Sequence, residues 1–158
     1  MCQWREKIQI KIIDPRVSQW GLPQYQTEGA AAVDLFACVD DPMFIEAQAP
    51  AVLVRSGIAI SFGDLSIAGL VLPRSGLGHK KGLILGNTVG LIDPDYNGEI
   101  LISVWNRSEV GSPPIEITPG ERIGQLAFVP IVRPSFEVVE EFTNQTMRGD
   151  DGFGSTGS

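Results

Sequence analysis

Residues 72–105 read LPRSGLGHKKGLILGNTVGLIDPDYNGEILISVW, and this stretch decides the fold. Short apolar runs alternate in it with polar turns at residues 73–81, 86–87 and 93–98. The last turn contains a proline, which fixes φ, and an Asn-Gly pair, which tolerates positive φ. The stretch therefore predicts short β-strands joined by loops, and such loops commonly carry binding and catalytic side chains. The polar candidates on these turns are Arg74, Ser75, Asn87, Asp93, Asp95 and Tyr96.

Alternating apolar and polar residues predict further strands on both sides of this stretch. The 18 glycines and 11 prolines separate these strands at short intervals, and no window of helical length has a 3.6-residue period. One helical turn is expected at residues 75–80 and a bulge at Gly57. The pattern favours an all-β sandwich, barrel or jelly roll. The expected strands are residues 8–12, 33–37, 43–47, 52–62, 65–72, 83–92, 99–105, 115–117, 122–132 and 135–139.

The composition limits the possible classes of protein. The chain has 158 residues, of which 43% are hydrophobic and 20% charged, which is typical of one globular domain. Its net charge of −7 disfavours nonspecific binding to nucleic acid or to anionic membranes. A phosphate-bearing ligand would therefore need local hydrogen-bond donors.

The cysteines and the N-terminal residues predict a cytoplasmic protein. Cys2 and Cys38 are the only cysteines, too few for a disulfide framework and without the spacing of a zinc site. The first residues, MCQWREKIQIKIIDPR, lack the apolar centre of a signal peptide. No run approaches the length of a membrane span.

Residues 143–158 differ in character from the rest, because their only sizeable apolar groups are Met147 and Phe153. A frayed terminus is one interpretation. A flexible lid is the other, since arginine, glycine, serine and threonine suit an anion. Residues 152–157 match G-x-G-x-x-G, but no strand precedes them and no helix can follow, so a dinucleotide site is excluded. The sequence contains no P-loop motif either.

Five blocks resemble, in order, the five signature blocks of the trimeric deoxyuridine triphosphate nucleotidohydrolases, the dUTPases. They are AAVDL at residues 31–35, PRSGLG at 73–78, GLIDPDYNGEI at 90–100, GERIGQL at 120–126 and RGDDGFGSTG at 148–157. Two positions depart from the blocks, because Ala32 and Asp151 both stand where the family usually has glycine. Asp151 adds negative charge to the segment that would cover a triphosphate.

The resemblance implies a jelly-roll-like distorted β-barrel at residues 1–142, with residues 143–158 as its glycine-rich lid. It implies a homotrimer with active sites at subunit contacts, and a tail supplied by a neighbouring chain. The implied reaction is hydrolysis of dUTP to dUMP and pyrophosphate, assisted by Mg²⁺. That reaction limits uracil incorporation into DNA and supplies dUMP for thymidylate synthesis.

The resemblance also implies residue roles. Asp93 is the general base that activates water, and Asp34 helps to hold Mg²⁺ through water. Asn87 reads uracil together with backbone groups of the hairpin around Gly90 and Leu101. Tyr96 packs beneath deoxyribose and excludes a 2′-hydroxyl. The implied contacts to phosphate are Arg74, Ser75, Gln125 and Arg148, Phe153 stacks on the base, and the remaining substrate-binding residues are Gly76, Gly154, Ser155 and Thr156.

Plainer readings remain open from the residues alone. Asp93 could cap a turn, Asp34 could lie on the exposed side of a strand, and each aromatic ring could be packing. His79, the only histidine, lies in a polar turn and is better read as solvated than as part of a catalytic triad. Two functional rivals are a cytosine-nucleotide deaminase and a non-catalytic trimer. The run 100–105 lacks the acid or base group that a deaminase needs, and the retained Asp93 disfavours the non-catalytic trimer.

Overall fold

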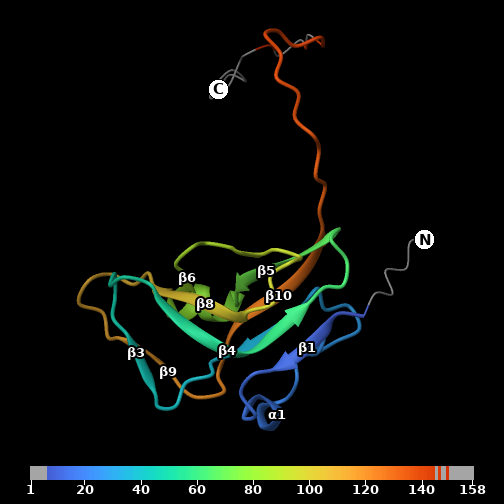
Figure 1. Cartoon of the computed structure of the whole chain (residues 1–158). Helices are drawn as coiled ribbons and strands as arrows, with labels where there is room; N and C mark the ends of the chain where they lie inside the picture. The colour runs from blue at the N-terminus through green and yellow to red at the C-terminus, as the bar shows by residue number, and fades with distance from the viewer. Residues whose placement is uncertain (1–6, 145, 147–148, 150–158) are drawn as a thin grey trace.

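The chain forms antiparallel β-structure in three sheets, in a computed structural model that describes residues 7–144, 146 and 149 (Figure 1). The first sheet has the order β1-β4-β8-β6, the second β2-β10-β5-β7, and the third pairs β3 with β9. The strands are β1 Gln9–Ile12, β2 Ala32–Phe36, β3 Met43–Ile45, β4 Val52–Ser61, β5 Ile67–Pro73, β6 Leu83–Leu85, β7 Gly90–Ile92, β8 Glu99–Asn106, β9 Ile115–Ile117 and β10 Arg122–Pro130.

The core lies between the two four-stranded sheets. Strand β8 illustrates the pattern, because Ile100, Ile102 and Val104 are fully buried while the alternate residues are more exposed. Strand β10 adds Leu126 from the facing sheet. This alternation with a period of two is what a strand with one buried face requires, so the all-β prediction is confirmed.

Two short helical segments complete the fold. One turn of α-helix, α1, spans Val17–Trp20, within a segment expected to be irregular. The helical turn expected at residues 75–80 is present, and it continues as the π-helix η1 at Leu77–Lys81. Neither helix is long enough to span a membrane, and the described residues contain no other candidate.

Two strand predictions were wrong. Residues 83–92 form two strands in different sheets, β6 and β7, because the chain turns between them with Thr88 at φ 62°. Residues 135–139 are not a strand. They belong to an extended arm that leaves the body after β10 (Figure 1), where none of the described strands pairs with them. The described strands also form open sheets and do not close into a barrel.

The predicted bulge at Gly57 is confirmed, since the β4–β8 register shifts between Arg55 and Ala59. Gly57 has φ +73°, which favours glycine. A Cβ there would lie 2.6 Å from Val17 Cγ2 and 3.0 Å from the buried Cys38 Sγ. The missing side chain thus lets α1 and the Cys38 segment pack against the bulge.

Gly57→Ala should therefore lower the stability of the chain by about 2–4 kcal/mol, because backbone strain and overpacking both act. Urea unfolding followed by tryptophan fluorescence measures the loss. Gly63→Ala is the matched control, because Gly63 has φ +68° but no atom within 4 Å of the added Cβ. It should lose only the strain component, so equal losses in both variants would contradict the packing argument.

Candidate functional site

A pocket of about 240 Å³ is lined by residues of β7 and β8, two strands that belong to different sheets. Five predicted site residues line it, and these are Asn87, Gly90, Asp93, Tyr96 and Leu101. They come from three neighbouring parts of the chain: the β6–β7 turn, strand β7 with the turn after it, and strand β8. The structure thus brings together an amide, a carboxylate, a phenol ring and strand backbone.

The β6–β7 turn is held closely against β8. The Gly86 amide donates to the Ser103 carbonyl at 3.0 Å, and the Thr88 amide donates to the Leu85 carbonyl at 3.1 Å. A Cβ on Gly86 would collide with Ala51 and lie 2.9 Å from Ser103 Oγ. Only glycine allows this approach, and it places the following residue, Asn87, at the pocket.

Asp93 follows strand β7 directly and is exposed at the pocket. Within the described part of the chain, no hydrogen bond or ion pair engages its carboxylate. Its backbone carbonyl accepts the Tyr96 amide at 3.1 Å, which closes the turn. The carboxylate is therefore free to accept a proton from a water molecule in the pocket.

A second cluster surrounds Asp34, which is buried in β2 with 7% of its surface exposed. The exposed-strand reading of this residue is therefore wrong. Arg122 Nη1 donates to Asp34 Oδ2 at 3.2 Å, and Arg74 Nε lies 3.1 Å from Oδ1. Arg74 Nη1 also donates to the Arg122 carbonyl at 3.1 Å. Two guanidinium groups thus share one carboxylate, which is the usual condition for burying such a charge.

Arg74 Nε is buried, and its contact with Asp34 lacks the direction of a hydrogen bond. We regard this contact as electrostatic, because the separation is short while the N–H points elsewhere. Among the described residues, no acceptor bonds to this N–H, so Arg74 has unused donor capacity there.

The register of β10 adds Gln125 to this cluster. Gln125 lies opposite Asp34 in β2 and opposite Leu72 in β5. Ser75 and Gly76 follow β5 at the start of the helical turn and are exposed. Three predicted phosphate contacts, Arg74, Ser75 and Gln125, thus come from adjoining elements together with Gly76. The predicted site residues Arg148, Phe153, Gly154, Ser155 and Thr156 lie outside the described residues.

The pocket and the Asp34 cluster share no residue within the described part of the chain. The described residues that line the pocket do not include Asp34, Arg74 or Gln125. Sequence reasoning also missed two participants. Arg122 belongs to the fourth block, but its place beside Asp34 depends on the β2–β10 pairing, so no local pattern indicated it. Ser103 carried no signal, because its place opposite the β6–β7 turn depends on the strand pairing.

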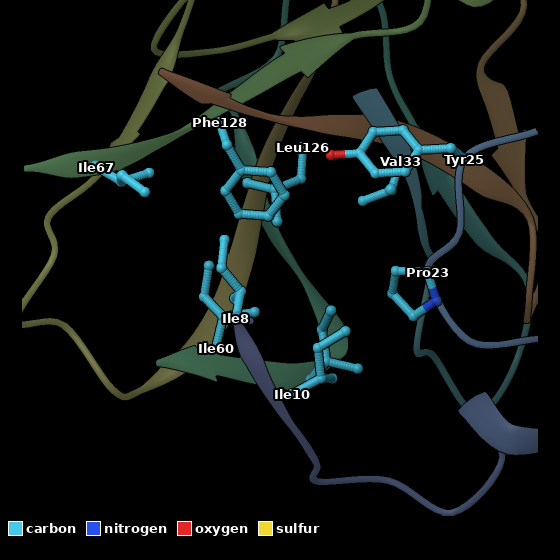
Figure 2. A pocket seen from close by; sticks show the side chains of 10 residues that line it. Ile8, Ile10, Pro23, Tyr25, Val33, Ile60, Ile67, Leu126 and Phe128 are labelled. Atoms are coloured by element: carbon cyan, nitrogen blue, oxygen red, sulfur yellow. The ribbon is translucent and has the colours of Figure 1, made fainter. Parts of the chain in front are cut away.

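A third feature, the apolar groove, is a pocket of about 330 Å³ between β1 and β10 (Figure 2). Apart from the Tyr25 hydroxyl, its side chains are apolar, and Ile8, Ile10 and Phe128 lie along its wall. Such a lining suits packing rather than chemistry.

The comparisons with known proteins agree on one family. The sequence model of the dUTPase family matches residues 18–157. A deoxyuridine 5′-triphosphate nucleotidohydrolase of Acinetobacter baumannii is 53% identical over 152 residues, which cover 96% of this chain and 98% of that protein. One from Citrobacter koseri is 52% identical over 153 residues, which cover 96% and 97%.

Solved structures agree as well. The dUTPase of Staphylococcus bacteriophage 80alpha with dUpNHpp has a TM-score of 0.79 and 26% identity, and the match covers 96% of this chain and 99% of that one. The D95N mutant dUTPase of phage phi11 of S. aureus has a TM-score of 0.72 and 22% identity, over 86% and 98%. That structure describes the coordination of a structural Mg(II) ion in the phi11 protein.

Asp34→Asn should destabilise the protein, because it leaves Arg74 and Arg122 close together without a shared anion. The free energy of unfolding should fall by about 1–2 kcal/mol. This is less than the loss for a fully buried ion pair, since the Arg122 side chain is 46% exposed. Asp40→Asn is the control, because Asp40 also pairs with an arginine but is 88% exposed. Equal unfolding midpoints for the two variants would contradict a structural role for Asp34.

Proposed function

The chain belongs to the dUTPase family, and from that premise we propose that it hydrolyses dUTP to dUMP and pyrophosphate. The observation that carries the proposal is the pocket that gathers Asn87, Asp93 and Tyr96. In the cell, this reaction would limit uracil incorporation into DNA and supply dUMP for thymidylate synthesis. The cytoplasmic location rests on the sequence alone and stays a prediction.

Base and sugar recognition follow from the pocket's polar and aromatic groups. The Asn87 amide offers one donor and one acceptor, which match the donor–acceptor edge of uracil. Backbone groups of Gly90 and Leu101 lie in the same wall. The Tyr96 ring packs beneath the deoxyribose and fills the space that a 2′-hydroxyl needs.

In the proposed reaction, water attacks the α-phosphorus in line with the bond to the bridging oxygen. Asp93 accepts a proton from this water as the new P–O bond forms, and pyrophosphate leaves as the bridging bond breaks. Arg74, Ser75 and Gln125 donate to phosphate oxygens and stabilise the developing charge. The backbone at Gly76 allows the phosphates to approach closely, because no side chain intervenes.

The donor set around Asp34 fits Mg²⁺ only through water. Each carboxylate oxygen faces one guanidinium group but retains a second lone pair, which can accept from a metal-bound water. The described residues contain no group of three potential metal ligands, so the substrate phosphates would supply the inner ligands. A bound Mg²⁺ would neutralise phosphate charge. The phi11 protein supports only a shared fold, because its sequence is 22% identical to that of this chain.

We further propose a homotrimer with shared active sites. Its first support is that the pocket and the Asp34 cluster share no described residue, so a substrate that contacts both can take the pocket from one chain and the cluster from another. Its second support is the arm after β10, in which Phe136 is 94% exposed and Val138 fully exposed. Exposed apolar residues of this kind mark contact surfaces.

The apolar groove gives the arm a place to pack on a neighbouring chain (Figure 2). It runs beside β1, which pairs only with β4 among the described strands, so the other edge of β1 can accept a further strand. Residues 1–142 would then form the assembled body and residues 143–158 the lid. In the lid, Arg148 and residues 153–156 would close over base and phosphates, and Asp151 would oppose that closure.

Release of pyrophosphate and of ammonia from dUTP, dCTP, UTP and dTTP tests the function directly. We expect pyrophosphate from dUTP and no ammonia from dCTP. Ammonia release would favour a deaminase, and tight binding without turnover would favour a non-catalytic protein.

Asp93→Asn should reduce kcat by about 10²-fold or more, the scale of a lost general base. Binding of a non-hydrolysable dUTP analogue should persist, because the amide keeps the size of the side chain. Asp95→Asn is the matched control, since Asp95 belongs to the same turn but does not line the pocket. Near-normal single-turnover rates for Asp93→Asn would refute the assignment.

The variant with both Phe136→Ser and Val138→Ser should associate more weakly than wild type, because it loses two exposed apolar anchors. Sedimentation equilibrium over a concentration series measures this shift. Val110→Ser is the control, since Val110 is 84% exposed but lies outside the arm. A wild-type mass of one chain at every concentration would rule out the trimer.

A further inference from the structure

The position of the Tyr96 ring is fixed by Gly98 and Glu99, at the end of its turn. Tyr96 Oη donates to the Glu99 carbonyl at 2.9 Å. The ring also lies directly against Gly98, where a Cβ would come within 2.6 Å of Tyr96 Cζ. The ring therefore follows the backbone of residues 98–99, and any shift of that backbone shifts the ring.

The Glu99 side chain ties this backbone to the neighbouring strand. Arg55 Nε lies 3.1 Å from Glu99 Oε1 and 3.0 Å from Oε2. The Gly57 amide also donates to Oε1, at 2.9 Å. The bulge in β4 makes this bond possible, because it frees the Gly57 amide from the strand ladder.

Neither Arg55 nor Glu99 is among the residues that line the pocket, so neither is placed to contact substrate. Arg55 lies opposite Leu101, a residue of the pocket wall, in the β4–β8 register. The Glu99 side chain is only 17% exposed, whereas that of Arg55 is 49% exposed. The pair is thus shielded at the carboxylate and open to solvent at the guanidinium.

We propose that Arg55 and Glu99 are a positioning pair that holds the Tyr96 ring against the pocket and so sets discrimination between deoxyribose and ribose nucleotides. The proposal deepens the proposed function and rests on it. An ion pair with this exposure adds little to stability. Its effect falls on the ring, because Glu99 is bound at both its backbone carbonyl and its carboxylate. Removing Arg55 leaves the carboxylate held by the Gly57 amide alone, so residues 98–99 and the ring can shift, which opens space for a 2′-hydroxyl.

The test compares kcat/KM for dUTP and UTP. Tyr96→Ala serves as the reference for complete loss of ring-based discrimination, because it removes the ring. Arg55→Met keeps the apolar stem but removes the cation, and we expect it to reduce the dUTP/UTP ratio by about three- to tenfold, the scale of one hydrogen bond. The kcat for dUTP should stay within about twofold of wild type, since general-base catalysis by Asp93 is untouched. Arg55→Lys should restore part of the ratio.

Two further measurements separate positioning from a merely structural role. In wild type, added salt should lower the ratio because the pair is half exposed, and in Arg55→Met the ratio should be flat with salt. Tyr96→Phe removes the bond to Glu99. The double variant with Arg55→Met should therefore reduce the dUTP/UTP ratio by a smaller factor than the product of the two single reductions. Lys81→Met is the control, because it breaks another ion pair, to Glu121 at 3.7 Å, away from the pocket.

The outcomes are distinguishable. Normal dUTP turnover with an unchanged ratio in Arg55→Met overturns the positioning pair and leaves the function standing. If that variant does not fold, Glu99→Gln, which keeps the shape of the side chain, takes its place under the same criterion. A wild-type chain without dUTP turnover overturns the function and this inference with it.

Discussion

The structure depends above all on the register of β10, the strand that pairs with both β2 and β5. This register places Leu126 between Val33 and Val71, and all three are buried. One position earlier, it places Gln125 beside Asp34. A slip of one residue would turn Leu126 outward and Gln125 into the core. Burial of apolar surface therefore fixes where the polar groups of the Asp34 cluster meet.

Electrostatics then determines what this cluster can bind. The protein carries a net charge of −7, yet two guanidinium groups face a single carboxylate here. Asp34 holds the two cations together in the absence of a ligand and leaves the cluster with one excess positive charge. An anion that approaches Arg74 meets a side chain that is 29% exposed and already oriented by Asp34 and by the Arg122 carbonyl, which lowers the entropy lost on binding.

Most of the fold could be predicted from the sequence, because strand alternation and turn chemistry are local properties. The bulge at Gly57 and the helical turn at 75–80 were predictable for the same reason. The strand expected at 135–139 failed because a strand needs a partner, and its alternating apolar residues face no sheet in one chain. The break between β6 and β7 falls at the polar turn of residues 86–87, but the apolar residues on both sides of that turn favoured one continuous strand.

The candidate site could be predicted as a set of residues but not as an arrangement. Asn87, Asp93 and Tyr96 were expected together, and they line one pocket. The pairing of Asp34 with Arg122 depends on the β2–β10 contact between residues 88 positions apart, which no local pattern encodes. The Arg55–Glu99 contact across β4 and β8 was missed for the same reason.

The close packing of Cys38 behind the Gly57 bulge also has a redox consequence. Burial raises the pKa of the Cys38 thiol, so little of it is the thiolate that oxidants and alkylating reagents attack. Peroxide or iodoacetamide can modify this sulfur only when the residues packed around it move apart, because Cys38 is buried. With Cys2, which lies outside the described residues, replaced by serine, the labelling rate of Cys38 would report how often this part of the core opens.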